Sequence, residues 1–239
     1  MKLADLVTGR LVRRYKRFLA DVELASGEVV TAHTANPGRM IGLCAPGGVV
    51  HLTRHDDPKR KLKYTWRLVE VGGRLVGVDP NLANGLVREA LDAGRIPELA
   101  GYPQLRPEVR YGQRSSRIDF LLSGDGRPPC YVEVKNVTLL EGRAGLFPDA
   151  VTARGLKHLR ELEDVVREGG RGVLLFVVQR PEPAFVAPAD AIDPAYGEGF
   201  RAALAAGVEA LAYQAEVTTA AITLTRSLEV RARAVAATV

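Results

Sequence analysis

Cysteine is almost absent from this chain of 239 residues: Cys44 and Cys130 are its only two. Two cysteines are too few for a disulfide framework, and they lack the spacing of a zinc site. Long hydrophobic runs are also missing, since the longest covers residues 172–178 and a membrane helix needs about 20. The N-terminus has no hydrophobic signal-peptide core and has an early acid, Asp5. These absences predict a cytoplasmic protein with no membrane partner, and leave its oligomeric state open.

Several catalytic signatures are missing as well. The sequence contains no P-loop, no dinucleotide-binding glycine fingerprint and no Gly-x-Ser-x-Gly elbow. It also shows no clear helix-turn-helix pattern, which argues against the most common DNA-reading motif.

Positive charge is concentrated in the first third of the chain. Residues 1–80 contain 14 Lys and Arg against 8 Asp and Glu, whereas residues 81–239 contain 19 against 20. The whole net charge of +5 is therefore due to the first segment. Basic surfaces attract nucleic acid because each neutralised phosphate releases counterions. A solvated basic surface without a partner is the alternative.

The first 80 residues resemble a small β domain. Short alternating segments separated by Gly-rich turns predict strands over residues 17–24, 28–34, 48–53, 64–71 and 74–78. Five short strands in this length favour a small barrel of the oligonucleotide-binding (OB) type, so residues 1–80 are assigned to an OB-like nucleic-acid-binding domain.

Residues 81–239 have a mixed α/β pattern, which predicts a second domain with a mixed sheet flanked by helices. Helices are expected over residues 84–93, with Asn84 as N-cap, over 151–168 and over 198–206. Strands are expected over residues 108–111, 117–123, 130–137, 171–179, 209–213 and 221–224. The segment 171–179 is almost continuously apolar, as in a strand buried on both faces.

Two neighbouring strands carry the clearest chemical pattern. Ile118 and Phe120 are expected on the core face of the first strand, which sets Asp119 on the opposite face. Glu133 and Lys135 alternate in the same way with the valines of the second strand. If the strands pair as a hairpin, two carboxylates and an ammonium converge.

Such a cluster suits metal-assisted phosphodiester hydrolysis. Mg²⁺ prefers carboxylate oxygens, so Asp119 and Glu133 are the predicted metal ligands, with Mn²⁺ as a substitute. The carbonyl of Val134 is a further candidate ligand, and Lys135 is predicted to position the nucleophile or stabilise phosphate charge. A surface salt bridge on an amphipathic strand is the alternative interpretation.

Other polar residues are candidates for the same site or for substrate binding. Glu89, on the helix over residues 84–93, is a fourth candidate catalytic residue, or else simply exposed. Tyr15 and Trp66 are candidates for base stacking or for the core, and the core is favoured for Trp66. The basic residues predicted to contact nucleic acid are Arg13, Arg14, Lys16, Arg17, Arg39, Arg154 and Lys157.

Five segments together resemble the sugar fermentation stimulation protein A family. They are RYKRFLADV (14–22), AHTANPGRM (32–40), SRIDFLL (116–122), YVEVKNVT (131–138) and FPDAVTARG (147–155). One departure is that Thr34, Ala35 and Pro37 replace the Cys, Pro and Thr usual in the second segment.

The resemblance implies an OB-type barrel followed by a nuclease domain of the PD-(D/E)xK class. In that pattern Asp119 is the strand acid, Glu133 and Lys135 are the (D/E)xK pair, and Glu89 matches the acid of the preceding helix. The family name implies an alternative function, a non-catalytic DNA-binding regulator of sugar-utilisation genes. A nucleic-acid chaperone with a degenerate metal site is a third hypothesis. Only the nuclease needs all three charged groups on one face.

Overall fold

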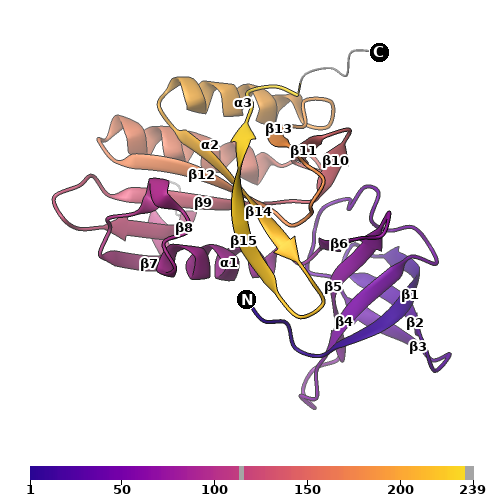
Figure 1. Ribbon diagram of the computed structural model, residues 1–239. Coiled ribbons are helices and arrows are strands. Elements are labelled where there is room, and N and C mark those ends of the chain that lie inside the picture. The colour runs from indigo at the N-terminus through magenta and orange to yellow at the C-terminus, as the bar shows by residue number, and fades with distance from the viewer. Residues whose placement is uncertain (113–115, 235–239) are drawn as a thin grey trace.

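The N-terminal part of the chain is a β domain of six strands. A computed structural model describes residues 1–112 and 116–234 (Figure 1). The first six strands are β1 (Leu6–Tyr15), β2 (Leu19–Leu24), β3 (Val29–His33), β4 (Val49–Arg54), β5 (Tyr64–Val71) and β6 (Arg74–Gly77). Gly72 and Gly73, both with positive φ, form the tight turn between β5 and β6. Positive φ at both central residues is the requirement of a type I′ hairpin.

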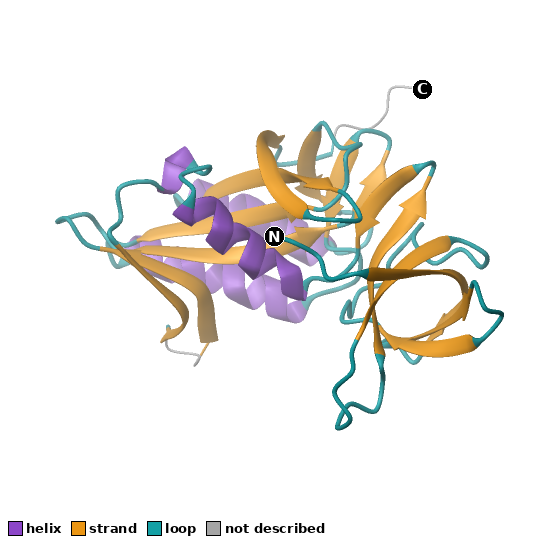
Figure 2. Cartoon of the chain, turned by 60° about the horizontal axis from the view of Figure 1, so that its bottom comes forward, coloured by secondary structure: helices purple, strands orange, loops and turns teal. Residues whose placement is uncertain are grey.

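These strands close into a barrel. β1 pairs with β2 and β4, and β3 pairs with β2 and, in parallel, with β5, which also pairs with β4. The ring is visible nearly end-on in Figure 2. Its interior is filled by apolar side chains that include Leu11, Val22 and Trp66, all at most 1% exposed. The expected OB-type barrel is therefore confirmed, and Trp66 belongs to its core.

In the rest of the described chain, the residues form a nine-stranded mixed sheet with three α-helices. Its strands are β7 (Gln104–Tyr111), β8 (Ser116–Ser123), β9 (Cys130–Val137), β10 (Leu139–Glu141), β11 (Ala144–Phe147), β12 (Arg171–Val178), β13 (Phe185–Pro188), β14 (Glu209–Val217) and β15 (Ile222–Val230). The helices are α1 (Asn81–Asp92), α2 (Ala153–Arg167) and α3 (Pro194–Ala205), and Pro97–Leu99 is a 3₁₀ turn. The strand order is β10-β11-β13-β15-β14-β12-β9-β8-β7.

Strand β12 explains the layering of this domain. Val173, Leu175 and Val177 pack in the cluster that contains α1, whereas Leu174 and Phe176 pack with α2 and α3. β12 also pairs in parallel with both β9 and β14. Its unbroken apolar sequence is thus the consequence of two cores, one on each face, as expected.

Some boundaries differ from the expectation. Helix α1 begins at Asn81, where the side chain of Asp79 accepts a hydrogen bond from the Asn81 N–H (2.9 Å), so Asn84 lies inside the helix and is not its N-cap. Helix α3 begins at Pro194, after the N-cap Asp193. Strand β1 was not expected, and neither were the short strands β10, β11 and β13.

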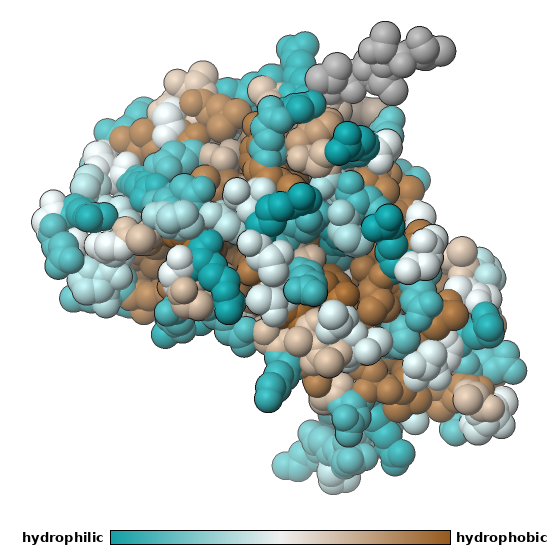
Figure 3. All heavy atoms as spheres, viewed as in Figure 1, coloured by the Kyte–Doolittle hydropathy of each residue, from teal (hydrophilic) through white to brown (hydrophobic). Residues whose placement is uncertain are grey.

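The barrel and the larger domain are joined by direct hydrogen bonds. The Gly77 N–H donates to the Gln179 carbonyl (2.8 Å), and the Met40 N–H donates to Oδ2 of Asp149 (2.9 Å). On the face seen in Figure 3, hydrophobic residues gather where the two parts meet. No helix among the described residues is long and apolar enough to cross a membrane.

Candidate active site

Strands β8 and β9 separate at the two predicted acids. Their ladder pairs Leu122, Leu121 and Phe120 with Cys130, Tyr131 and Val132, and it ends there. The same register would set Asp119 opposite Glu133. Instead, the N–H of Val134 donates to Oδ2 of Asp119 (2.7 Å). A side-chain carboxylate thus takes the place of a strand partner, and both acids lie at the opening.

Asp119 is held by two donors. Besides the Val134 N–H, the side-chain amide of Asn84 on α1 donates to its Oδ1 (2.8 Å). Burial and the negative charge of Glu133 nevertheless raise the pKa of Asp119, because the two hydrogen bonds offset only part of these effects.

Glu133 is almost fully buried, at 3% exposure. The ammonium of Lys135 donates to its Oε1 (2.6 Å), and Nδ1 of His158 on α2 contacts the same oxygen. Burial alone would raise the pKa of Glu133, but Lys135 and His158 outweigh it and the pKa lies below its ordinary value. Oε2 of Glu133 is buried and has no hydrogen-bond partner within the described chain.

Helix α2 contributes a polar stripe to this site. Nε of Arg154 donates to Nε2 of His158 (3.3 Å). Because Nε2 then acts as acceptor, Nδ1 is the ring nitrogen that donates to Glu133. Glu161, one turn further on, is 1% exposed, and Nζ of Lys157 lies 3.8 Å from its Oε1. Spacings of three and four residues place these four side chains on one helix face.

The hydroxyl of Tyr111 on β7 lies close to the same acids. Burial and the charges of Glu133, Glu161 and Asp119 raise its pKa. The hydroxyl is buried and has no hydrogen-bond partner among the residues that the structure describes. Two acids whose pKa values are shifted, Asp119 and Glu133, beside a buried hydroxyl are typical of a functional site.

Glu89 does not reach this cluster, contrary to the expectation. Its carboxylate pairs with the amino group of Met1 (2.5 Å) and its side chain is half exposed. On α1, Asn84 contacts Asp119. Glu89 follows five residues later, so its side chain points about 140° away from that of Asn84 around the helix axis. The helical acid is therefore directed to the N-terminus of the chain.

The expected faces of β8 also need a correction. Phe120 packs in the core that contains α1, but Ile118 packs in the core that contains α2 and α3. Two residues apart on a regular strand would share a face. The change of face coincides with the end of the β8–β9 ladder. The side chains of β8 therefore change from one core to the other at Asp119.

Asn84, Tyr111, His158 and Glu161 are site residues that the sequence did not indicate. His158 and Glu161 left a usable signal, because they share the helical spacing of Arg154 and Lys157. Asn84 was assigned to a helix cap, and Tyr111 lies on an edge strand with no chemical motif.

The basic residues of the barrel divide into two groups. Two are engaged within the barrel: Nε of Arg13 donates to Asp21 (2.9 Å) while its guanidinium lies over Tyr15, and Arg14 donates to the backbone carbonyls of residues 17, 36, 38 and 39. Arg14 is thus a structural residue of the barrel, and its predicted contact with nucleic acid is not supported.

Lys16, Arg17 and Arg39 are exposed. Lys16 and Arg17 form the β1–β2 turn, with positive φ at both. Phe18, which follows them, is 41% exposed and stacks on His33 with 6.4 Å between ring centroids. A basic turn beside an exposed phenylalanine that stacks on a half-buried histidine has the chemistry of single-strand binding.

An OB-type barrel followed by a mixed sheet whose acids meet at a strand opening defines a two-domain protein with a restriction endonuclease-like domain. Residues 12–78 match the family described as "SfsA N-terminal OB domain", and residues 81–221 match "Sugar fermentation stimulation protein RE domain". The chain belongs to the sugar fermentation stimulation protein (SfsA) family.

Relatives match along nearly their whole length. A "Sugar fermentation stimulation protein homolog" of Geobacter sulfurreducens is 59% identical over 95% of this chain and 97% of its own. A homolog of Maricaulis maris is 57% identical over 95% and 96%. The structure is also similar to that of Pyrococcus furiosus SfsA in complex with Ca²⁺, with a TM-score of 0.87, 27% identity, and coverage of 97% of this chain and 98% of the other.

Proposed function

We propose that this protein is a metal-dependent nuclease that hydrolyses phosphodiester bonds in DNA or RNA. The observation that carries the proposal is the opening between β8 and β9, where Asp119, Glu133 and Lys135 come together from adjacent strands. A protein that only binds nucleic acid has no need of two acids beside an ammonium at a strand opening. The restriction endonuclease-like domain supports the same function.

The donor set fits a hard divalent cation. Within the described residues, no group of three or more His, Cys, Asp and Glu is arranged to hold a metal. Mg²⁺, however, is commonly bound through one or two carboxylates, with water and substrate phosphate as the other ligands. Asp119 and Glu133 would hold it, and the partnerless Oε2 of Glu133 is available for it. The Ca²⁺ bound by the Pyrococcus furiosus relative supports a divalent ion here, and we assign Mg²⁺ with Mn²⁺ as a substitute.

When bound, such an ion supplies Lewis acidity and neutralises negative charge on the phosphodiester. Residues of the chain position the carboxylates and the substrate. Asn84 and the Val134 N–H fix the carboxylate of Asp119, and His158 fixes that of Glu133. Lys135 directs its ammonium at the same opening, where it orients the attacking water or stabilises charge on the phosphoryl oxygens. Lys16, Arg17 and Arg39 on the barrel hold the substrate backbone.

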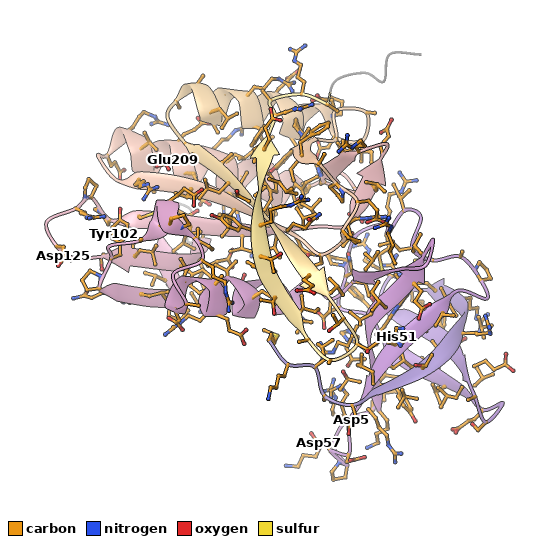
Figure 4. All side chains as sticks on the ribbon, in the orientation of Figure 1. Asp5, His51, Asp57, Tyr102, Asp125 and Glu209 are labelled. Carbon is orange, nitrogen blue, oxygen red and sulfur yellow. The ribbon has the colours of Figure 1, made fainter. Side chains whose placement is uncertain are left out.

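Cleavage assays test this function directly. Single- and double-stranded DNA and RNA are incubated with the protein in Mg²⁺, in Mn²⁺ and in EDTA. We expect metal-dependent cleavage that falls by about 10²–10³-fold in Lys135→Ala, the loss typical of one transition-state stabiliser, with binding retained. Asp119→Asn should also be inactive. Asp125→Asn is the matched control, since Asp125 lies at the outer end of the same hairpin (Figure 4).

Two results would contradict the proposal. Equal cleavage by Asp119→Asn would show that a contaminating enzyme is responsible. Tight binding without cleavage in any divalent metal would favour the non-catalytic regulator instead.

A further inference from the structure

A cavity of about 310 Å³ lies between the barrel and the larger domain. The barrel contributes Arg17 and the loop over residues 36–38. The larger domain contributes the end of β9, with Asn136 and Thr138, and the segment over residues 147–152 that leads into α2. The cavity thus begins one residue beyond Lys135 of the acid cluster.

The walls of this cavity are held in place by hydrogen bonds within the barrel and by one between the domains. Arg14 donates to the carbonyls of Asn36 and Gly38, each at 2.9 Å, and Asp149 accepts the Met40 N–H at 2.9 Å. A Cβ on Gly38 would come within 2.1 Å of Oδ1 of Asp149, so only glycine allows this approach. A cavity with walls fixed in this way is largely formed before any ligand arrives.

The sequence segments that carry the family resemblance converge here. Four of the five contribute to the lining, namely those over residues 14–22, 32–40, 131–138 and 147–155. The acid cluster uses no residue of the first two. The segments over residues 14–22 and 32–40 therefore contact those over residues 131–138 and 147–155 at this cavity, and not at the acid cluster.

The lining combines an apolar body with a rim that carries one cationic and one anionic side chain. Leu139, Leu146 and Phe147 form apolar wall, and Val151 lies at the edge with 76% of its surface exposed. Two charged side chains line the cavity, and one of them, Asp149, already accepts the Met40 N–H. Arg17 remains for an anionic ligand. A flat apolar body with a negative charge at its edge is the chemistry of a nucleobase attached to a phosphate.

A cavity of about 310 Å³ admits one base. It is too small for a duplex, because the major groove of a duplex is already about 12 Å wide. Proteins that act on a nucleic acid commonly hold single bases out of the stack in such pockets. The exposed Phe18–His33 pair, next to Arg17, continues the path over the barrel.

We propose that this cavity binds one unpaired nucleobase of the substrate strand, whose backbone passes Arg17. The inference rests on the proposed nuclease function and narrows its substrate to single-stranded or locally opened nucleic acid. Asn136 directly follows Lys135 on β9, so the cavity adjoins the acid cluster along the strand, with the two side chains on opposite faces.

Binding in EDTA tests the inference without any need for cleavage. Fluorescence anisotropy is measured with a labelled single strand and with the blunt duplex of the same sequence. We expect Val151→Asp to weaken single-strand binding at least about fivefold, the effect of losing one stacked base, and to leave duplex binding unchanged. Val29→Asp is the matched control, because Val29 is 58% exposed at the opposite end of β3 from the cavity loop. Arg17→Gln is a second variant, with the exposed Arg160→Gln as its control.

An abasic scan then locates the base. Removing one base at a time from the single strand should weaken binding at one position by the same fivefold or more, and this penalty should be absent in Val151→Asp. Equal affinity for duplex and single strand, or an abasic scan without a sensitive position, would overturn the inference. So would a mononucleotide that binds as tightly as the oligonucleotide, since the cavity would then serve a free nucleotide. Because these measurements need no metal, failure of cleavage and failure of the base pocket are distinguishable.

Discussion

Asp119 and Glu133 carry like charges at one strand opening, yet their pKa values move in opposite directions. Burial and the charge of Glu133 raise the pKa of Asp119, whereas Lys135 and His158 keep the pKa of Glu133 low. The difference arises from their partners: Asp119 has only neutral donors, while Glu133 has an ammonium. Two acids whose pKa values are shifted in opposite directions can take different roles in one reaction.

Metal binding should therefore depend on pH through Asp119. A cation needs the ionised carboxylate, so protons compete with it at a higher pH than for an ordinary aspartate. We expect Mg²⁺ at 100 times its Kd to increase the free energy of unfolding by about 2.7 kcal/mol, which raises the melting temperature. We also expect the apparent Kd to increase as the pH is lowered. Scanning calorimetry measures the melting temperature and titration calorimetry the Kd, both over a pH series.

Asp119→Asn should abolish this stabilisation, and Asp125→Asn should retain it. A metal-induced shift that survives in Asp119→Asn, or that grows on acidification, would contradict the assignment of Asp119 as a ligand.

Asp21 is a residue whose charge stabilises the barrel. It accepts hydrogen bonds from Nε of Arg13 (2.9 Å), the Tyr15 hydroxyl (3.1 Å) and the Thr31 hydroxyl (2.9 Å). Burial opposes ionisation, but these donors outweigh it and the pKa of Asp21 lies below its ordinary value. The stability that this carboxylate contributes is present above the unfolded-state pKa and is lost as the pH falls through the folded-state pKa.

Asp21→Asn should accordingly lower the free energy of unfolding at pH 7 by about 1–3 kcal/mol. The difference from the wild type should shrink as the pH falls below the ordinary aspartate range. Urea unfolding at pH 7 and at pH 3 measures it, with the exposed Asp5→Asn as control (Figure 4). A difference that is the same at both pH values would refute the role of the charge.

At the scale of elements, one arginine of β1 organises the loop that reaches the other domain. The guanidinium of Arg14 donates to four backbone carbonyls, those of Arg17 (2.6 Å), Asn36, Gly38 and Arg39. Met40, at the end of this loop, has a positive φ of 51°, which a methionine rarely adopts. The loop keeps this conformation because both Arg14 and Asp149 bind its backbone.

Arg14→Lys should loosen this loop, because an ammonium cannot reproduce the planar fork of a guanidinium. We expect a loss of about 1–3 kcal/mol in unfolding free energy and faster hydrogen exchange of the amides of residues 36–40. Arg10→Lys is the control, since Arg10 makes a single bond to the carbonyl of Gly47 (3.0 Å). Equal exchange of residues 36–40 in both variants would show that Arg14 does not hold the loop.

The elements that the sequence predicted are those with their own periodicity. Strand β12 and helix α2 bury regular apolar patterns, and both were found within two residues of their bounds. Strand β1 was not expected because its end belongs to the basic run Arg13 to Arg17, which suggested a binding segment instead of a strand. Strand β7 is longer than expected because it lies at the sheet edge, where Pro107 and polar residues are tolerated.

The site was only partly predictable for a related reason. Alternation along a strand indicated Asp119, Glu133 and Lys135, but no local pattern shows where two strands separate. Glu89 was chosen from its place before the strands, yet the direction of its side chain depends on how α1 packs on the sheet. Tertiary packing decides such positions, and sequence spacing does not.

On the scale of the whole molecule, the excess of positive charge and the acid cluster lie in different domains. The excess of positive charge lies in residues 1–80, whereas the acid cluster lies in the sheet of the larger domain. The cavity that contains Arg17 lies between the two domains and reaches Asn136, the residue after Lys135 on β9. A polyanion is therefore expected to be attracted first by the barrel.

Nucleic-acid affinity should therefore depend steeply on salt, and the dependence should come from the barrel. Each phosphate contact contributes about 0.9 to the slope of log K against log salt for a duplex, and about 0.7 for a single strand. Replacing both Arg17 and Arg39 by Gln should flatten the single-strand slope by about 1.4. Replacing the exposed pair Arg95 and Arg160 of the larger domain by Gln should leave it unchanged. Anisotropy titrations in EDTA from low to moderate salt measure the slopes. If both pairs flatten the slope equally, the barrel does not direct binding and the attraction belongs to the basic protein as a whole.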